Sequence, residues 1–247
     1  MSVSWKDLQA WTEARIGLPR QGNAVATKAL LEFQWAHARA RDAVHRSWNA
    51  TALVQALTIL GETTLIAPSQ ANSREIYLQR PDLGRQLAAQ AITDLSQFAG
   101  EAPLAFCVSD GLSATAIDQH FLPFWKILRE KLRASRYSYA PLVLVPFGRV
   151  AVSDTIGEKL GAKVVVIFVG ERPGLTAADS MGAYLTYDPK TGNPDARRNC
   201  ISNIRPPAGL SYELAAGKLC YLLAESLRRQ ISGVALKEDA ANRLSHG

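Results

Sequence analysis

Three turns that combine glycine with charged side chains are the parts of this chain best suited to binding a ligand. Each of the turns 110–112, 148–150 and 170–175 directly follows a short apolar run. The last turn, Gly-Glu-Arg-Pro-Gly-Leu, presents Glu171 between residues that fix the path of the backbone. Carboxylate and guanidinium groups in such turns can hold a polar ligand through hydrogen bonds. Ordinary turn chemistry with solvated charges is the alternative interpretation.

A long polar stretch at residues 188–203 ends in Asn-Cys-Ile-Ser-Asn. Loops of this length in a compact domain are often functional, and amide and hydroxyl groups suit a neutral, amide-rich ligand better than a phosphate. Cys200 has no Cys or His at metal-ligand spacing, so we do not expect zinc. Arg197 and Arg198 could lower the pKa of its thiol, but no base is identifiable that would make it a nucleophile.

Two short motifs resemble known functional sites, and we reject both as sites. The segment 111–115 (Gly-Leu-Ser-Ala-Thr) resembles a nucleophile elbow, but it lacks the final glycine, so Ser113 is expected to begin a helix. Asp118-Gln119-His120 resembles the motif that grips cobalt in base-off cobalamin proteins, but no glycine follows and its setting is helical. No triple-glycine fingerprint of a dinucleotide site opens a helix anywhere in the chain.

The elements that position these residues change in character near residue 100. The residues before it read as helices, the clearest at 28–48 with an apolar stripe interrupted by His37 and Arg41. These two side chains could meet acids of a partner chain, or lie partly solvated at the edge of the buried stripe. A further helix is expected from 80 to about 98, where Pro81 marks its start.

Beyond residue 100, short apolar runs alternate with helical patterns. We expect strands at 103–109, 141–147, 163–169 and 182–187. We expect helices at 112–132, 154–160 and 211–231. Such alternation predicts an α/β fold: a mainly parallel, Rossmann-like sheet with helices on both faces, whose carboxyl ends gather the turns described above. We therefore predict a helical region at 1–100 and an α/β domain at 101–247.

Length and composition limit the possible classes of protein. The chain has 247 residues, 47% of them hydrophobic, which is enough for a real core. No run is long enough to span a bilayer, and the N-terminus lacks the apolar centre of a secretory signal. Three scattered cysteines form no disulfide framework, so a reducing cytoplasm is expected. The net charge of +6 permits acidic partners without requiring them.

Several ordered motifs, taken together, point to one family. They are Ala14–Leu18, Phe33-Gln34, His37-Ala38 with Ala40–His45, Tyr77-Leu78 with Arg80–Gly84, Asp110–Ala114, Gly148–Val152, Ile156–Glu158, Val169–Leu175 and Asn199–Arg205. In these motifs the chain resembles the small subunit, or light chain, of ethanolamine ammonia-lyase. The resemblance extends from about residue 8 to residue 237, which is nearly the whole chain.

The resemblance implies a subunit of an adenosylcobalamin-dependent lyase that converts ethanolamine to acetaldehyde and ammonia. In that family the large subunit carries the substrate site, and the small subunit covers base-on cobalamin at the interface within a hetero-oligomer. The family's cobalamin contacts fall on Val150, Glu171 and Cys200 of this chain. The resemblance therefore implies no catalytic residue and no metal ligand here, and an isolated chain without lyase activity.

The chain departs from the family pattern at two places. Ala36 stands where an aspartate is usual, which affects a local polar contact. Family members often carry a longer N-terminal extension associated with bacterial microcompartments, whereas this chain begins only a few residues before the region of resemblance. We therefore expect a cytoplasmic location, with packaging in a microcompartment as the alternative. Two other functions stay open: a nucleotide- or nucleic-acid-binding α/β module without catalysis, and a hydrolase that uses Ser113.

Overall fold

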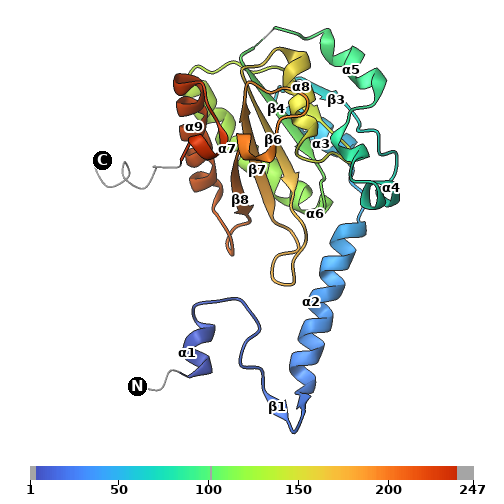
Figure 1. Ribbon diagram of the computed structural model, residues 1–247, viewed down its shortest axis with the longest axis vertical. Helices are drawn as coiled ribbons and strands as arrows, with labels where there is room; N and C mark the ends of the chain where they lie inside the picture. Colours follow the sequence, from blue (N-terminus) through green and yellow to red (C-terminus); the bar gives the residue numbers. More distant parts are fainter. Residues whose placement is uncertain (1–3, 101, 238–247) are drawn as a thin grey trace, which may run out of the picture.

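A six-stranded sheet forms the centre of the protein in the computed structural model, which describes residues 4–100 and 102–237 (Figure 1). Its strands are β3 (Thr64–Ile66), β4 (Leu104–Ser109), β5 (Leu142–Leu144), β6 (Val164–Gly170), β7 (Met181–Tyr187) and β8 (Arg198–Ile204). They lie in the order β3-β5-β4-β6-β7-β8. The pairings from β3 to β6 are parallel, and β7 pairs antiparallel with both of its neighbours.

Helices cover both faces of this sheet, and a long helix projects away from it (Figure 1). The helices are α1 (Trp5–Gln9), α2 (Thr27–His45), α3 (Ala50–Ile59), α4 (Arg74–Gln79), α5 (Ala89–Ser96), α6 (Ala114–Ala116), α7 (Leu122–Ala134), α8 (Val152–Leu160) and α9 (Tyr212–Arg229). A two-stranded hairpin, β1 (Arg20–Gln21) and β2 (Ala24–Val25), precedes α2. A π-helical turn, Ile117–Phe121, joins α6 to α7.

The two faces of the sheet bury two separate cores because side chains alternate along each strand. Phe106 of β4 packs against Trp125 of α7, with ring centroids 5.3 Å apart, in the core that also includes α9. Its neighbour Cys107 faces the opposite core, with Leu95 of α5 and Ile156 of α8. All residues of β4 and β6 are buried, which explains their nearly continuous apolar sequence.

The structure confirms the α/β architecture and most elements after residue 100. The strands expected at 103–109, 163–169 and 182–187 appear as β4, β6 and β7, and the run at 141–147 gives the shorter β5. The helices expected at 154–160 and 211–231 appear as α8 and α9. The helix expected at 112–132 is divided at the π-helical turn, and Pro123, which has no N–H to continue the helical hydrogen bonds, lies in the first turn of α7.

Two predictions for the first hundred residues are wrong. The region is not only helical, because β3 adds a parallel edge strand to the sheet; at three residues, it is too short to show a period of two. The helix expected from 80 to about 98 does not form as one unit. Gly84 lies in a short 3₁₀ turn, and the chain runs extended near Leu87 before α5 begins. The division of the chain near residue 100 remains a prediction, and β3 pairs across it.

The helix expected at 28–48 is present as α2, but its apolar stripe is not buried. The buried positions of α2 are Ala29, Ala36 and Ala43, whereas Leu30 and Phe33 are exposed. The stripe was expected to face the protein's own core, and the helix instead projects beyond the sheet (Figure 1). No helix within the described residues combines the length and apolar character needed to cross a bilayer.

Candidate functional site

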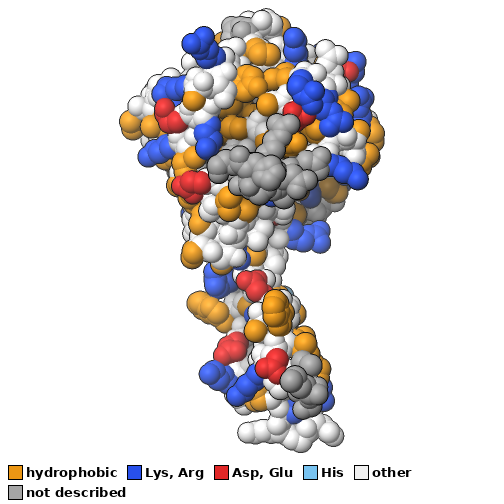
Figure 2. Space-filling view, turned by 90° about the vertical axis from the view of Figure 1, so that its left-hand side faces the viewer, with side chains coloured by type: hydrophobic (Ala, Val, Ile, Leu, Met, Phe, Trp, Pro, Cys, Tyr) orange, Lys and Arg blue, Asp and Glu red, His pale blue; other side chains and the backbone are white. Residues whose placement is uncertain are grey.

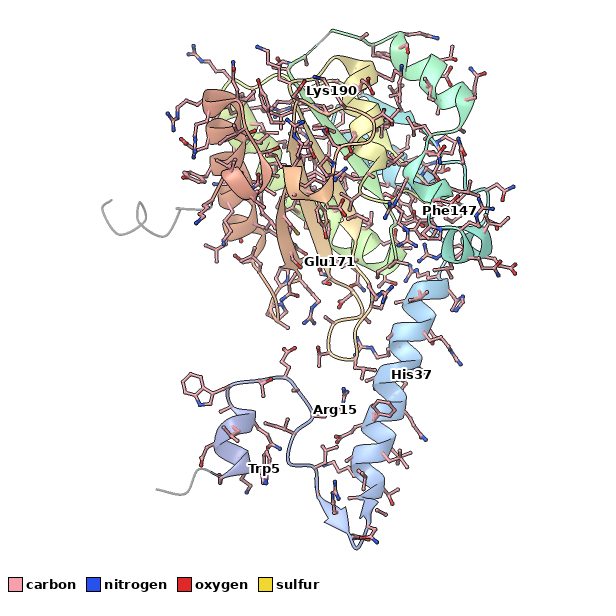
Figure 3. The ribbon with its side chains drawn as sticks, in the orientation of Figure 1. Trp5, Arg15, His37, Phe147, Glu171 and Lys190 are labelled. Carbon is pink, nitrogen blue, oxygen red and sulfur yellow. The ribbon has the colours of Figure 1, made fainter. Side chains whose placement is uncertain are left out.

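The three glycine-containing turns meet at the carboxyl edge of the parallel strands, as the sequence predicted. Asp110 follows β4, Phe147 and Arg149 lie in the turn after β5, and Glu171 follows β6. The labelled residues Phe147 and Glu171 lie at the side of the sheet that faces α2, whereas Lys190 lies at the opposite end (Figure 3). Open α/β sheets bind ligands at this edge.

Asp110 fixes the first two turns relative to each other. Its carboxylate accepts the backbone N–H of Phe147 at 2.8 Å and lies 3.1 Å from the guanidinium of Arg74. Phe147 has a positive φ of 58°, a conformation that side chains other than glycine adopt at a cost. Burial raises the pKa of Asp110 to about 6, although Arg74 opposes this shift. The carboxylate therefore maintains a strained turn at the edge of the sheet.

Glycine allows the turns after β4 and β6 to pack backbone against backbone. A Cβ atom on Gly170 would lie 2.1 Å from the carbonyl oxygen of Ser113 and 2.5 Å from that of Asp110. Gly111 has a φ of 52°, and a Cβ atom there would lie 2.4 Å from the carbonyl oxygen of Gly170. The two turns can therefore approach this closely only because both positions lack a side chain.

Glu171 joins the end of β6 to the end of β8. Its carboxylate accepts the hydroxyl of Ser202 at 2.5 Å and the backbone N–H of Asn203 at 3.1 Å. Gly182 lies so close that a Cβ atom there would meet Oε1 at 2.9 Å. A carboxylate has about four lone-pair sites, so acceptor capacity remains on this half-buried group.

Cys200 lies on β8, directly opposite Tyr184 on β7. The prediction that it belongs to a long polar loop is wrong, because β8 occupies 198–204. As an edge strand, β8 keeps polar side chains on its exposed positions, and the sequence therefore shows no apolar run. Desolvation raises the pKa of the Cys200 thiol, so the group is protonated at neutral pH and is a poor nucleophile.

Two adjoining pockets bring the three predicted cofactor residues together. One, of about 350 Å³, is lined by Val150 and Cys200, and the other, of about 260 Å³, by Val150 and Glu171. Arg149, Val150 and Tyr184 belong to both pockets. Three turns or strands that are far apart in the sequence therefore form one continuous polar and apolar surface.

Arg149 and Tyr184 line both pockets, although the sequence did not single them out as site residues. The guanidinium of Arg149 lies over the ring of Tyr77, 4.5 Å from its centroid, and its buried Nε–H has no hydrogen-bond partner in the described part of the chain. Such a donor is costly unless a ligand satisfies it. Arg149 could have been recognised from its turn, whereas Tyr184 depends on the register between β7 and β8, which the sequence did not reveal.

The residues of the rejected motifs have structural roles. Ser113 caps α6, as predicted, and its hydroxyl donates to the carbonyl of Ala178 at 2.9 Å. His120 lies on the π-helical turn, where Nδ1 is 2.8 Å from the Tyr212 hydroxyl. His37 and Arg41 are exposed on α2. These positions supply no nucleophile and base within reach of the pockets.

Comparison with known proteins identifies the family of the chain. The family model for the ethanolamine ammonia-lyase light chain matches residues 2–237. Similar relatives are the ethanolamine ammonia-lyase small subunits of Pseudomonas fluorescens strain Pf0-1, at 50% identity over 96% of this chain and 87% of the relative, and of Azotobacter vinelandii, at 50% identity over 96% and 88%. The match covers nearly the whole chain, and the chain therefore belongs to the ethanolamine ammonia-lyase small-subunit family.

Proposed function

We propose that this chain holds adenosylcobalamin at the carboxyl edge of its sheet and that a large subunit covers the rest of the cofactor. Family membership implies an ammonia-lyase complex with a large-subunit partner. The observation that carries the proposal is the convergence of Val150, Glu171 and Cys200 on two adjoining pockets. Each of the three residues comes from a different part of the sequence.

The chemistry of the pocket walls fits the periphery of a corrin, which carries neutral amide side chains. The carboxylate of Glu171 can accept amide N–H groups, and the orphaned Nε–H of Arg149 can donate to an amide oxygen. Val150 and the protonated thiol of Cys200 offer apolar contact. The fit between the pocket and the corrin therefore depends on these donors and acceptors, and above all on the Nε–H of Arg149, which has no partner in the described residues.

The size of the pockets indicates that the site is completed by another surface. The volume of about 350 Å³ lies at the low end for small-molecule sites and that of about 260 Å³ lies below it, whereas adenosylcobalamin is a large ligand. A cofactor seated here would remain open on one side. The large subunit is the surface that closes it, and this supports a heteromeric enzyme.

The residues at the carboxyl edge suggest which tasks this chain and the large subunit would each perform. When bound, the cofactor supplies a radical by homolysis of its cobalt–carbon bond. Glu171 and Arg149 would orient the corrin, and the pocket walls around Val150 would exclude water from its covered side. Because the described residues place no nucleophile and base together at the pockets, we propose that the large subunit binds ethanolamine and that the isolated chain is inactive.

The positions of the histidine and cysteine side chains support two finer parts of the proposal. No histidine is among the described residues that line the two pockets, so no side chain there would replace the cofactor's own base, and we propose the base-on form of the cofactor. The three cysteines are free thiols, which suits a reducing compartment. A cytoplasmic location is therefore part of the proposal, with microcompartment packaging as the alternative.

The proposal is tested by assaying ethanolamine turnover with adenosylcobalamin in three mixtures: this chain alone, the large subunit alone, and both together. We expect acetaldehyde and ammonia only when both subunits are present, because neither holds a complete site. Turnover by this chain alone would contradict the proposal. A large subunit that reaches full activity without this chain would contradict it as well.

A further inference from the structure

Residues 4–46 form an arm that projects from the body of the protein (Figure 1). The arm comprises α1, the β1–β2 hairpin and α2. Among the described residues, its hydrogen bonds to the body lie at the end of α2. Arg46 bonds to Asp118 at 3.0 Å, and the carbonyl of Val44 accepts Nε–H of Arg74 at 2.5 Å. The rest of the arm therefore stands away from the body's own core.

The arm exposes far more large apolar side chains than its length accounts for. It has 43 of the 247 residues but nine of the fifteen exposed large hydrophobic side chains in the described residues. The nine are Trp5, Leu8, Trp11, Leu18, Val25, Leu30, Leu31, Phe33 and Trp35. Figure 2 shows hydrophobic side chains along this lower part of the molecule. Exposed apolar surface on this scale marks an interaction site.

The first half of α2 is apolar on more than one side. Leu30 and Phe33 lie on the stripe that the sequence predicted to face a core, whereas Leu31 and Trp35 project elsewhere and are 58% and 68% exposed. A helix that carries large apolar side chains on more than one side is normally enclosed by other elements. In the described residues, only small side chains of α2 are buried, so a partner must supply the missing cover.

The arm surface is continuous with the proposed cofactor edge. A pocket of about 610 Å³ lies between Leu18, Leu30 and Phe33 of the arm and Leu175 and Thr176 of the loop after β6. That loop begins at Glu171, which lines the neighbouring cofactor pocket. A partner seated on the edge of the sheet therefore reaches the arm through the same loop.

Charge distinguishes between the possible occupants of this surface. The arm carries seven Lys and Arg against four Asp and Glu, a net charge of +3. A second copy of the arm would bring like charges together, whereas a different protein with an acidic rim would complement them. Building on the proposed function, we infer that the arm is the docking element for the large subunit, which meets it with an apolar surface bordered by acidic residues.

The test measures the affinity of this chain for the purified large subunit without cobalamin, by surface plasmon resonance. The variant is Leu31→Ser with Trp35→Ser, because both side chains are largely exposed and their loss leaves the core intact. We expect at least a tenfold loss of affinity, since buried aromatic anchors dominate interface energies. The control is Ile59→Ser, an 86% exposed apolar residue on the body, which is expected to change affinity by less than twofold.

Equal affinities of the double variant and the wild type would overturn the inference. Concentration-dependent dimerisation of the wild-type chain alone that the double variant abolishes would also overturn it, because the arm would then bind a second copy. Circular dichroism and the thermal midpoint of each variant verify that the fold is unchanged.

The outcome for the arm is separable from the outcome for the cofactor site. Glu171→Gln is expected to keep the wild-type affinity for the large subunit and to weaken only cobalamin binding. If the arm variant docks normally while Glu171→Gln weakens cobalamin binding, the arm inference fails and the proposed function stands. If the arm variant no longer binds the large subunit and Glu171→Gln leaves the cobalamin affinity unchanged, the proposed cofactor site is contradicted and the arm inference stands.

Discussion

Two carboxylates hold the carboxyl edge in similar ways but are suited to different tasks. Asp110 accepts the backbone N–H of Phe147, and Glu171 accepts that of Asn203; both acceptor bonds fix a non-glycine residue with φ near 58°. Asp110 is fully buried and paired with Arg74. Glu171 is half-buried beside a pocket and retains acceptor capacity. Asp110 is therefore a structural anchor, and Glu171 is the group that can also meet a ligand.

The buried carboxylate of Asp110 predicts a specific dependence of stability on pH. Its folded pKa of about 6 lies above the ordinary value of 3.8, so the folded state binds the proton more tightly. Its contribution to stability is therefore largest below about pH 4 and is lost as the pH rises through about 6. Relative to Asp110→Asn, the wild type should lose on the order of 2–3 kcal/mol of unfolding free energy between pH 4 and 7.

Urea unfolding of both proteins at several pH values measures this difference. The comparison uses the change with pH, so any constant cost of the amide cancels. A difference that is flat between pH 4 and 7, or that favours the wild type as the pH rises, would contradict the assignment of a raised pKa to Asp110.

The sequence predicted those site residues that belong to a local pattern or to a motif of the family resemblance. Turns after apolar runs identified the neighbourhoods of Val150 and Glu171, because the ends of parallel strands converge. Cys200 was located by resemblance, and its local structure was mistaken for a loop. The contacts of Tyr184 and the stacking of Arg149 on Tyr77 depend on packing between distant segments, which no local pattern encodes.

At the scale of elements, buried strands were predictable and marginal ones were not. β4 and β6 are apolar on both faces because helices cover both faces of the sheet, and each strand therefore shows a run of consecutive apolar residues. β3 and β8 lie at the edges of the sheet, where one is short and the other polar. Their pairing is set by neighbours in the sheet, so their own sequences give little indication of it.

The close contact between the turns after β4 and β6 predicts the cost of a single methyl group. Gly170→Ala should lower the unfolding free energy by about 2 kcal/mol or more, because the new Cβ meets two backbone oxygens that cannot move independently. The matched control is Gly217→Ala in α9, where nothing lies within 4 Å of the new atom. That change should raise stability by about 0.5–1 kcal/mol, since alanine favours a helix interior.

Chemical denaturation of the two glycine variants provides the measurement. If Gly170→Ala proved as stable as the wild type, the backbone contact between the two turns would not be as close as described. Destabilisation by Gly217→Ala would instead show that substitution of any glycine is harmful and would remove the specificity of the result.

At the scale of the whole molecule, the chain is built as part of a larger assembly. The carboxyl edge of the sheet and the apolar arm lie on the same side of the body, and the loop after β6 connects them (Figures 1 and 3). The net charge of +6 includes +3 from the arm. The positive charge therefore suits a protein partner with acidic groups as well as it suits a nucleic acid, and the apolar arm favours the protein.

The central claim, that Glu171 holds adenosylcobalamin at this edge, is tested most directly by cofactor affinity in the reconstituted two-subunit complex. Equilibrium titration should show that Glu171→Gln weakens binding by roughly 5- to 150-fold, which corresponds to about 1–3 kcal/mol for a charged acceptor that the bound cofactor would cover. Glu130→Gln removes the same charge from the exposed far end of α7, and should leave affinity unchanged. Unchanged affinity in Glu171→Gln, with an intact complex, would contradict the account.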